Sequence, residues 1–309
     1  MKAPAHDGPT RAGRVISSHG RDAVVLDDEG LRIHCRLQGR KLSVVCGDGV
    51  RFRLAQGEGA AGLLTEVLPR RTALARLNQR GESEPVAANL TQLACVVAPT
   101  PAPDFGLCDR YLAAAEWAGL KACIVANKFD LPDPAGALAA LDEYVRIGYP
   151  VVRASKRVAD GAAELALRLT GEISVLVGQS GVGKSSLTNL LVPGVEARVD
   201  EVTRASESGR HTTSSSSLYP LPGGGELIDS PGVRDFAPPL PAPRDIAGGF
   251  REIVALAGDC RFQDCRHRRE PGCAVAVAGE RVSARRLASY RRLLDLAEEM
   301  AGRTPRFRR

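Results

Sequence analysis

The sequence lacks any apolar run of the roughly 18 residues that a membrane-spanning helix needs. Residues 1–7 contain no apolar stretch that could serve as a secretory signal. No internal repeat is present either. We therefore expect a cytoplasmic protein that does not contact membranes.

Cysteine is also sparse, with 8 residues among 309, which is too few for a disulfide scaffold. Five cysteines stand singly in apolar stretches and are expected to be small buried thiols: Cys35, Cys46, Cys95, Cys108 and Cys123. The other three crowd into residues 260–273. The composition is that of an ordinary globular protein, 44% apolar and 25% charged, and the length suggests two domains, or three if some are small.

The net charge of +6 is unevenly distributed. Residues 1–80 hold 14 Lys and Arg against 8 Asp and Glu, residues 81–245 hold 14 against 20, and residues 246–309 hold 14 against 8. Two basic ends around an acidic middle are typical of a chain whose ends bind a polyanion. Ordinary solvated surface charge is the equally simple alternative.

The first 60 to 70 residues read as short strands, at residues 14–16, 23–26, 31–37 and 50–54. In the last two, apolar residues alternate with Arg32, Arg36, Arg51 and Arg53, so one face of each strand is basic. This pattern predicts a small all-β barrel such as an OB-fold that binds RNA. An SH3-like barrel would give nearly the same pattern.

From about residue 90, fully apolar strands alternate with helical segments. The strands are predicted at residues 93–98, 122–126, 151–152, 173–177 and 227–228, and the helices at residues 108–117, 135–146 and 184–191. This alternation predicts a mostly parallel α/β sheet covered on both faces. Trp117 is expected in its core.

The proline-rich residues 238–243 predict a linker, and a helix follows with Ser283 as its N-cap. Its apolar positions, Leu287, Tyr290, Leu294 and Ala297, recur at helical spacing, and four arginines are expected on its surface: Arg285, Arg286, Arg291 and Arg292. We therefore predict three domains: an RNA-binding OB-fold at residues 1–75, an α/β domain at residues 76–240 and a mostly helical domain at residues 241–309.

A phosphate-binding pattern lies at residues 178–185, where GQSGVGKS matches G-x-x-x-x-G-K-[ST] between a predicted strand and a predicted helix. Glycines let backbone amides curl around a phosphate, and the helix N-terminus adds partial positive charge. Lys184 is expected to reach the β- and γ-phosphates, and Ser185 to ligate Mg²⁺. The predicted nucleotide contacts here are Gly178, Gln179, Ser180, Gly181, Val182, Gly183, Lys184, Ser185 and Ser186.

The base is predicted from the N-K-x-D pattern at residues 127–130, which follows another predicted strand. A carboxylate at Asp130 can accept two hydrogen bonds from guanine, whereas adenine lacks that donor pair. Asn127 would brace the phosphate loop and Lys128 would lie over the base. Ser155, in the sequence Ala-Ser-Lys at residues 154–156, could close over guanine O6 with backbone amides.

The D-x-P-G pattern at residues 229–232 predicts that Asp229 lies behind Mg²⁺ and that the Gly232 amide contacts the γ-phosphate. Thr212 or Thr213 in the polar segment 209–217 would complete the Mg²⁺ contacts, as a switch loop held by the γ-phosphate. Position 233 is Val, where many GTPases have a water-orienting Gln. His211 is the candidate that replaces it, and an ordinary loop histidine is an equal alternative. Catalytic candidates are therefore Lys184, Ser185, Asp229, His211 and Thr212.

The order of these motifs is unusual, because N-K-x-D precedes the phosphate loop. This order indicates a circularly permuted GTPase domain, a P-loop hydrolase acting on GTP. A metal site is predicted beyond it, from the spacing of Cys260, Cys265, His267 and Cys273. Three thiolates and one imidazole complete a tetrahedral shell, so we expect one structural Zn²⁺.

Taken together, the basic barrel, the permuted motifs and the run CRFQDCRHRREPGC resemble the bacterial RsgA family of small-subunit-dependent GTPases. The resemblance covers about residues 10–300. It implies an OB-fold, a permuted GTPase domain and a zinc-binding helical domain. It further implies GTP hydrolysis that is stimulated by the small ribosomal subunit, contact with its rRNA, and a role in late subunit maturation.

Several functions compete with a GTPase switch. A kinase or metabolic enzyme would need a second substrate pocket, which is not legible in the sequence. An RNA-binding adaptor with a vestigial phosphate loop disagrees with the intact Lys184, Ser185, Asp229 and Asp130. A GTP-dependent factor that acts on another ribonucleoprotein is the remaining alternative. A monomer that does not bind DNA is expected.

Overall fold

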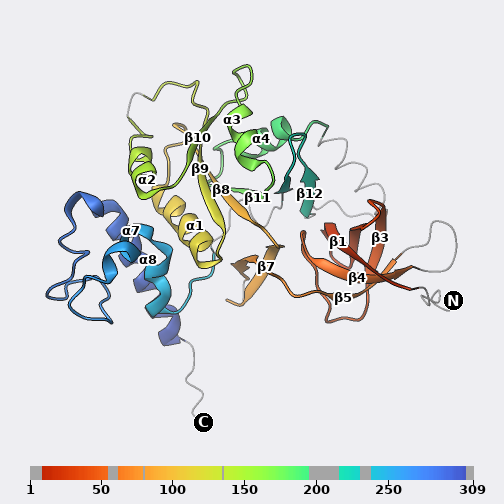
Figure 1. Ribbon diagram of the computed structural model, residues 1–309, viewed down its shortest axis with the longest axis horizontal. Helices are drawn as coiled ribbons and strands as arrows, with labels where there is room; N and C mark the ends of the chain where they lie inside the picture. The colour runs from red at the N-terminus through yellow and green to blue at the C-terminus, as the bar shows by residue number, and fades with distance from the viewer. Residues whose placement is uncertain are drawn as a thin grey trace, which may run out of the picture.

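The computed structural model describes residues 9–54, 62–78, 81–133, 136–194, 216–229 and 238–303. Along the chain, a small β-barrel comes first, a sheet covered by helices second and a helical part last (Figure 1). This order confirms the predicted fold class. The domain boundaries at residues 75 and 240 stay predictions, and the first falls within a strand. Within the described ranges, no helix is long and apolar enough to cross a membrane.

Five strands form the barrel: β1 (Thr10–His19), β2 (Asp22–Asp27), β3 (Arg32–Leu37), β4 (Gly49–Leu54) and β5 (Gly62–Val67). They pair in the order β1-β2-β3-β5-β4, and pairing of β1 with β4 closes the barrel. Val15, Val25, Phe52 and Leu64 fill the interior. A closed barrel of five strands in this order is OB-like.

The predicted basic face of the barrel is confirmed. Arg32 and Arg36 on β3 and Arg51 and Arg53 on β4 are all exposed, while the alternating apolar residues point inward. Arg51 pairs with Glu66 across the surface, with 3.5 Å between Nε and Oε2. Because an exposed ion pair contributes little stability, this guanidinium can readily exchange Glu66 for another anion.

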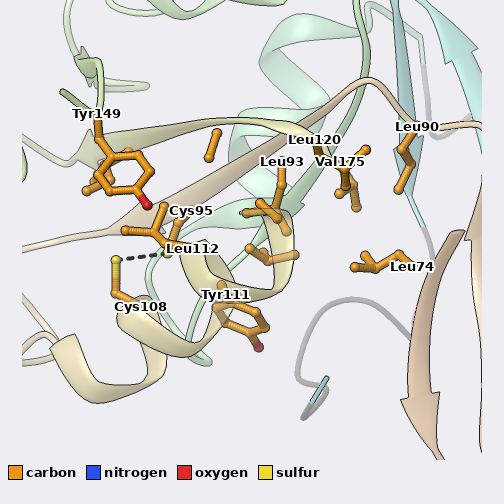
Figure 2. Close-up of a cluster of buried hydrophobic side chains, with 14 of the residues drawn as sticks. Leu74, Leu90, Leu93, Cys95, Cys108, Tyr111, Leu112, Leu120, Tyr149 and Val175 are labelled. Carbon is orange, nitrogen blue, oxygen red and sulfur yellow. Dashed lines mark hydrogen bonds between the residues drawn. The ribbon is translucent and has the colours of Figure 1, made fainter. Parts of the chain in front are cut away.

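A hairpin of β6 (Ala73–Leu77) and β7 (Ser83–Ala88) follows the barrel. Its Leu74 packs into the core of the α/β part, beside Leu90 (Figure 2). The barrel reaches the same core through the buried Cys46. The Asn89 side-chain amide also donates to the Gly47 carbonyl oxygen at 2.8 Å. Barrel, hairpin and α/β part are therefore packed together.

The sheet of the α/β part has the order β10-β9-β8-β11-β13-β12 and is parallel except for β12. Its strands are β8 (Gln92–Val97), β9 (Lys121–Asn127), β10 (Val151–Ala154), β11 (Ile173–Val177), β12 (Ser216–Pro220) and β13 (Glu226–Asp229). The predicted parallel strands are confirmed. Strand β8 is buried along its whole length, whereas β10 also carries the exposed Arg153.

Two pairs of helices cover the two faces of this sheet. Residues of α1 (Phe105–Trp117) and α2 (Leu141–Ile147) pack in one core, and residues of α3 (Ala163–Leu169) and α4 (Lys184–Leu191) in the other. The prediction of a helix over residues 135–146 was wrong in its start. The carboxylate of Asp133 accepts from the amides of Ala137 and Leu138, and this local turn precedes the helix.

All five single cysteines are buried, as predicted. Burial raises the pKa of Cys35 and of Cys46 to about 12, so these thiols stay protonated at neutral pH. Cys95 of β8 and Cys108 of α1 lie with their sulfur atoms 3.3 Å apart in the core that Figure 2 shows.

The C-terminal part contains η1 (Pro243–Gly249), α7 (Arg251–Ala257), η2 (Gly279–Arg281) and α8 (Ala284–Arg303). The predicted N-cap is confirmed, because the Arg286 amide donates to the Ser283 hydroxyl at 3.1 Å. Trp117 does not lie in the α/β core. It packs instead against the C-terminal core, where the absence of a side chain at Gly249 makes room for its ring.

The prediction that Arg286 lies on the surface was also wrong. Its side chain is fully buried between Asp109 of α1 and Glu252 of α7. Arg285 pairs with Asp109 and Glu143, and Arg291 donates to the carbonyl oxygens of residues 267 and 268. Helical spacing alone cannot distinguish a solvated arginine from one that is paired with another element.

Candidate functional site

The predicted nucleotide motifs meet at one edge of the sheet. Parallel strands carry their carboxyl ends on the same side, and ligands of open α/β sheets bind there. Asn127 ends β9, Ser155 follows β10, Gly178 follows β11 and Asp229 ends β13. Residues spread over about a hundred positions of sequence therefore surround one site.

The phosphate loop lies between β11 and α4 and depends on its glycines. Gly178 has φ 142°, and a Cβ there would lie 2.3 Å from the Val96 carbonyl oxygen. Gly183 has φ 101°, and a Cβ there would lie 2.4 Å from Nδ2 of Asn127. Both positions exclude other residues. The loop therefore curls tightly and opens the helix, as a phosphate cradle requires.

Lys184 lies within the curve of this loop. Its side chain is almost completely buried, and Nζ donates to the carbonyl oxygens of Gly178 at 2.6 Å and Gln179 at 2.8 Å. A charged ammonium held at this place suits the phosphates of a nucleotide. Ser180 and Ser185 are exposed beside it, and Ser186 is half-buried.

Asn127 and Lys128 brace the phosphate loop. The Asn127 amide is buried, and its Nδ2 donates to the Val182 carbonyl oxygen at 2.7 Å. Lys128 Nζ donates to the carbonyl oxygens of Gly181 at 2.8 Å and Thr100 at 2.7 Å. The two residues thus tie the base-binding motif to the phosphate loop.

Asp130, the expected guanine reader, has an exposed side chain at this edge. The buried Ser155 hydroxyl donates to its Oδ1 and accepts from the Arg157 amide at 3.0 Å. One carboxylate oxygen is therefore held by the second base-binding motif. This contact orients the carboxylate before any ligand binds.

The segment 100–104 also lies at this site, which the sequence motifs did not predict. The Gln179 side chain accepts from the Asp104 amide at 2.7 Å and donates to the Ala102 carbonyl oxygen at 3.0 Å. Both ends of the Gln179 side-chain amide are therefore hydrogen-bonded to this segment. We expect the backbone amide of Gln179, and not its side chain, to contact a phosphate. The signal in the sequence was the position of this proline-rich segment, directly after a buried parallel strand.

Asp229 ends β13, next to the phosphate loop across the β11–β13 pair. The other residues that were expected to contact Mg²⁺, the γ-phosphate or the attacking water lie outside the described residues: His211, Thr212 and Gly232.

The four predicted metal ligands come together in the C-terminal part. The ligand atoms of Cys260, Cys265, His267 and Cys273 all lie within 4.8 Å of one another. His267 Nδ1 lies 3.6 Å from the Cys260 sulfur and 3.5 Å from the Cys273 sulfur. Zn²⁺ bonds of about 2.0–2.3 Å put tetrahedral ligands roughly 3.5–3.8 Å apart, so the cluster fits a closed zinc shell.

Metal binding by this cluster should depend on pH. Burial lowers the pKa of His267, which keeps the imidazole neutral, as a ligand must be. Burial and the neighbouring thiols of Cys273 and Cys260 raise the pKa of Cys265 to about 12. A bound cation would therefore displace protons from the cluster, which predicts binding that strengthens with pH.

Helix α8 holds the loop that carries these ligands. Tyr290 donates its hydroxyl to the Arg266 carbonyl oxygen at 2.9 Å, and Arg291 Nη2 donates to the His267 carbonyl oxygen at 3.0 Å. His267 itself has φ 55°, an uncommon conformation for a residue with a side chain. These contacts show why the loop and the helix fold as one unit.

Comparisons with known proteins agree with this geometry. A family model described as RsgA GTPase matches residues 67–238. The chain is 44% identical over 296 residues to a protein of Azotobacter vinelandii and 45% identical over 296 residues to one of Pseudomonas fluorescens strain Pf0-1. Both are named small ribosomal subunit biogenesis GTPase RsgA, and each match covers 93% of this chain and 86% of the relative.

Two solved structures are similar over nearly the whole chain. YjeQ from Thermotoga maritima superposes with a TM-score of 0.73 at 30% identity, covering 94% of this chain and 99% of that one. YloQ, described as a circularly permuted GTPase, gives a TM-score of 0.71 at 25% identity, covering 99% and 100%. The predicted permuted order of the motifs is thereby confirmed.

Proposed function

The chain belongs to the RsgA GTPase family, and we propose that it hydrolyses GTP to GDP and phosphate as a switch in late maturation of the small ribosomal subunit. We further propose that the subunit stimulates this hydrolysis and that the protein contacts its rRNA. One observation carries the proposal. The N-K-x-D motif and the phosphate loop meet at one sheet edge, where Asn127 and Lys128 connect them, and Asp229 ends the strand β13 at the same edge.

The nucleotide would bind along this edge. Phosphates would lie in the curve of residues 178–183, against backbone amides and the ammonium of Lys184. The base would be read by Asp130, which Ser155 already orients. Adenine offers an acceptor where guanine offers a donor, so this carboxylate discriminates between them.

Hydroxyl and carboxylate oxygens suit Mg²⁺, which enters with GTP and supplies charge neutralisation at the phosphates. The residues that would hold it are Ser185, Asp229 and Thr212. The attacking water needs another group, because Val233 cannot orient it. We propose His211 for this role, with Gly232 contacting the γ-phosphate.

A structural Zn²⁺ would be held by Cys260, Cys265, Cys273 and Nδ1 of His267. All four positions are protein ligands, so the ion would keep no site for a substrate and would serve folding. The exposed arginines of β3 and β4 support contact with rRNA phosphates at the other end of the chain. We propose that the protein works as a cytoplasmic monomer.

Nucleotide specificity and product analysis test the enzymatic part of the proposal. The full-length protein with Mg²⁺ should bind GTP in preference to ATP and release GDP and phosphate in equal amounts. Phosphate transfer to another acceptor would identify a kinase. Binding of GTP without turnover, even with small subunits present, would identify an adaptor with a vestigial phosphate loop.

A further inference from the structure

Strand β1 belongs to two parts of the molecule at once. It pairs with β2 and β4 inside the barrel and with β12 of the α/β sheet. The resulting sheet runs without a break from β10, beside the nucleotide site, to β4, on the basic face of the barrel. Figure 1 shows β12 facing β1 across the junction.

The register of these strands leads directly to the nucleotide site. Ser17 of β1 is paired with Ser217 of β12, and Ser217 is paired with Asp229 of β13. Neighbouring strands lie about 4.8 Å apart, so Ser17 lies two strand spacings, roughly 10 Å, from the backbone of Asp229. The barrel strand β1 is therefore hydrogen-bonded to β12, the direct neighbour of the strand that ends at Asp229.

A bulge in β1 strengthens this junction. Val15 pairs with Val25 and Ser17 with Val24, so Ile16 is an extra residue without a partner on β2. Val15 lies in the barrel core, whereas Ile16 packs against the α/β core. A bulge re-aims a side chain in this way, and here it gives β1 an apolar contact in each part.

An ion pair fixes the other end of the same strands. Arg14 of β1 binds both carboxylate oxygens of Glu226 in β13, with 2.6 Å between Nη1 and Oε2. Glu226 begins the four-residue strand that Asp229 ends. The Arg14 side chain is 31% exposed and the Glu226 side chain 19%. A bidentate pair between a guanidinium and a carboxylate fixes the orientation of both groups.

We propose that Arg14 and Glu226 are positioning residues that couple the barrel to the Asp229 carboxylate, so that a small subunit bound at the barrel accelerates GTP hydrolysis through β1. The inference rests on the proposed function. Movement of β1 relative to β13 would displace Asp229, because the ion pair and the ladder row Ser17–Ser217–Asp229 attach β1 at both ends of β13. The subunit must favour one arrangement of this junction to have an effect.

The test uses the full-length protein and saturating small subunits. The variants are Arg14→Gln, Glu226→Gln and the double variant Arg14→Glu with Glu226→Arg. Lys121→Gln is the matched control, because it removes the Lys121–Glu172 ion pair of the same sheet without touching β1. Basal kcat, stimulated kcat, subunit affinity and thermal unfolding are measured for each.

Each single variant should lower the ratio of stimulated to basal kcat about fivefold or more, the size of an ordinary coupling between sites. The double variant should restore at least half of the ratio, and the control should keep it. A ratio equal to that of the control, no recovery in the folded double variant, or a loss explained by subunit affinity alone would overturn the inference. Absence of stimulation in the unaltered protein would instead contradict the proposed function.

Discussion

Arg286 of α8 and Asp109 of α1 form an ion pair at 2.7 Å with both side chains fully buried. The two residues lie 177 positions apart in the sequence. Glu252 accepts two further hydrogen bonds from the same guanidinium, and Tyr144 donates its hydroxyl to Asp109. Burial alone would lower the pKa of Arg286. The carboxylates of Glu252 and Asp109 raise it by more than burial lowers it, so the pKa lies above its usual value and the guanidinium stays charged. This cluster joins the C-terminal part to the α/β part.

Loss of one partner should destabilise this joint strongly. Arg286→Met removes the cation from the buried Glu252 carboxylate and leaves Asp109 only its pair with Arg285, and we expect the free energy of unfolding to fall by about 3–5 kcal/mol. Chemical denaturation measures it. Arg244→Gln is the control, because it breaks an exposed pair with Asp245 and should cost less than about 1 kcal/mol. Equal losses in both variants would contradict the role of the cluster.

Asp130→Asn should change the base preference. The substitution replaces an acceptor of two guanine donors, and unpaired polar groups should weaken GTP binding roughly ten- to a hundredfold. Binding should move towards xanthine nucleotides, which a nucleotide titration measures. Asp142→Asn, an exposed carboxylate on α2, should bind like the unaltered protein. Equal affinity of the unaltered protein for ATP and GTP would refute the assignment of Asp130.

Metal analysis of purified protein should find one Zn²⁺ per chain. Cys265→Ser should lose the metal and unfold the C-terminal part while GTP binding stays largely intact. Asp264→Asn, an exposed neighbour, should retain both metal and fold. Protein purified without any zinc, or an unchanged fold in the Cys265 variant, would rule out a structural zinc site.

Subunit binding should depend steeply on salt. If the arginines of β3 and β4 meet rRNA phosphates, the slope of log affinity against log salt should fall by about one for each arginine removed, starting with Arg36→Gln. Arg153→Gln in the α/β part is the control and should keep the slope. A subunit affinity that does not change with salt would show that these arginines do not contact phosphates.

Much of the fold could be predicted because its signals are local. The alternation of apolar and polar residues predicted β3 and β4, and short apolar runs predicted the parallel strands. The spacing of its glycines predicted the phosphate loop. Strand β5 was missed because the sequence of Gly62–Val67 does not alternate apolar and polar residues: Leu63 and Leu64 are adjacent, and so are Thr65 and Glu66. Strand β12 was missed as well, because it begins within the run of serines at residues 214–217 and depends on β1 and β13 for its pairing.

The candidate nucleotide-binding residues stay predictions, and they were easier to name from the sequence than the contacts that hold them. Motif spacing predicts Asn127, Asp130 and Lys184 without a structure. The contacts that hold them involve residues remote in sequence, such as Thr100 beside Lys128. Arg286 gives the sharpest case, because its partners lie on α1 and α7. Only tertiary packing decides which charges are buried.

We infer that this GTPase responds to the small ribosomal subunit. The most direct measurement compares GTP turnover by the unaltered protein alone, with purified small subunits and with purified large subunits. We expect slow turnover by the protein alone, because Val233 cannot orient water, and at least a tenfold increase, about 1.4 kcal/mol in the barrier, with small subunits only. Turnover that is equal in all three conditions would contradict it.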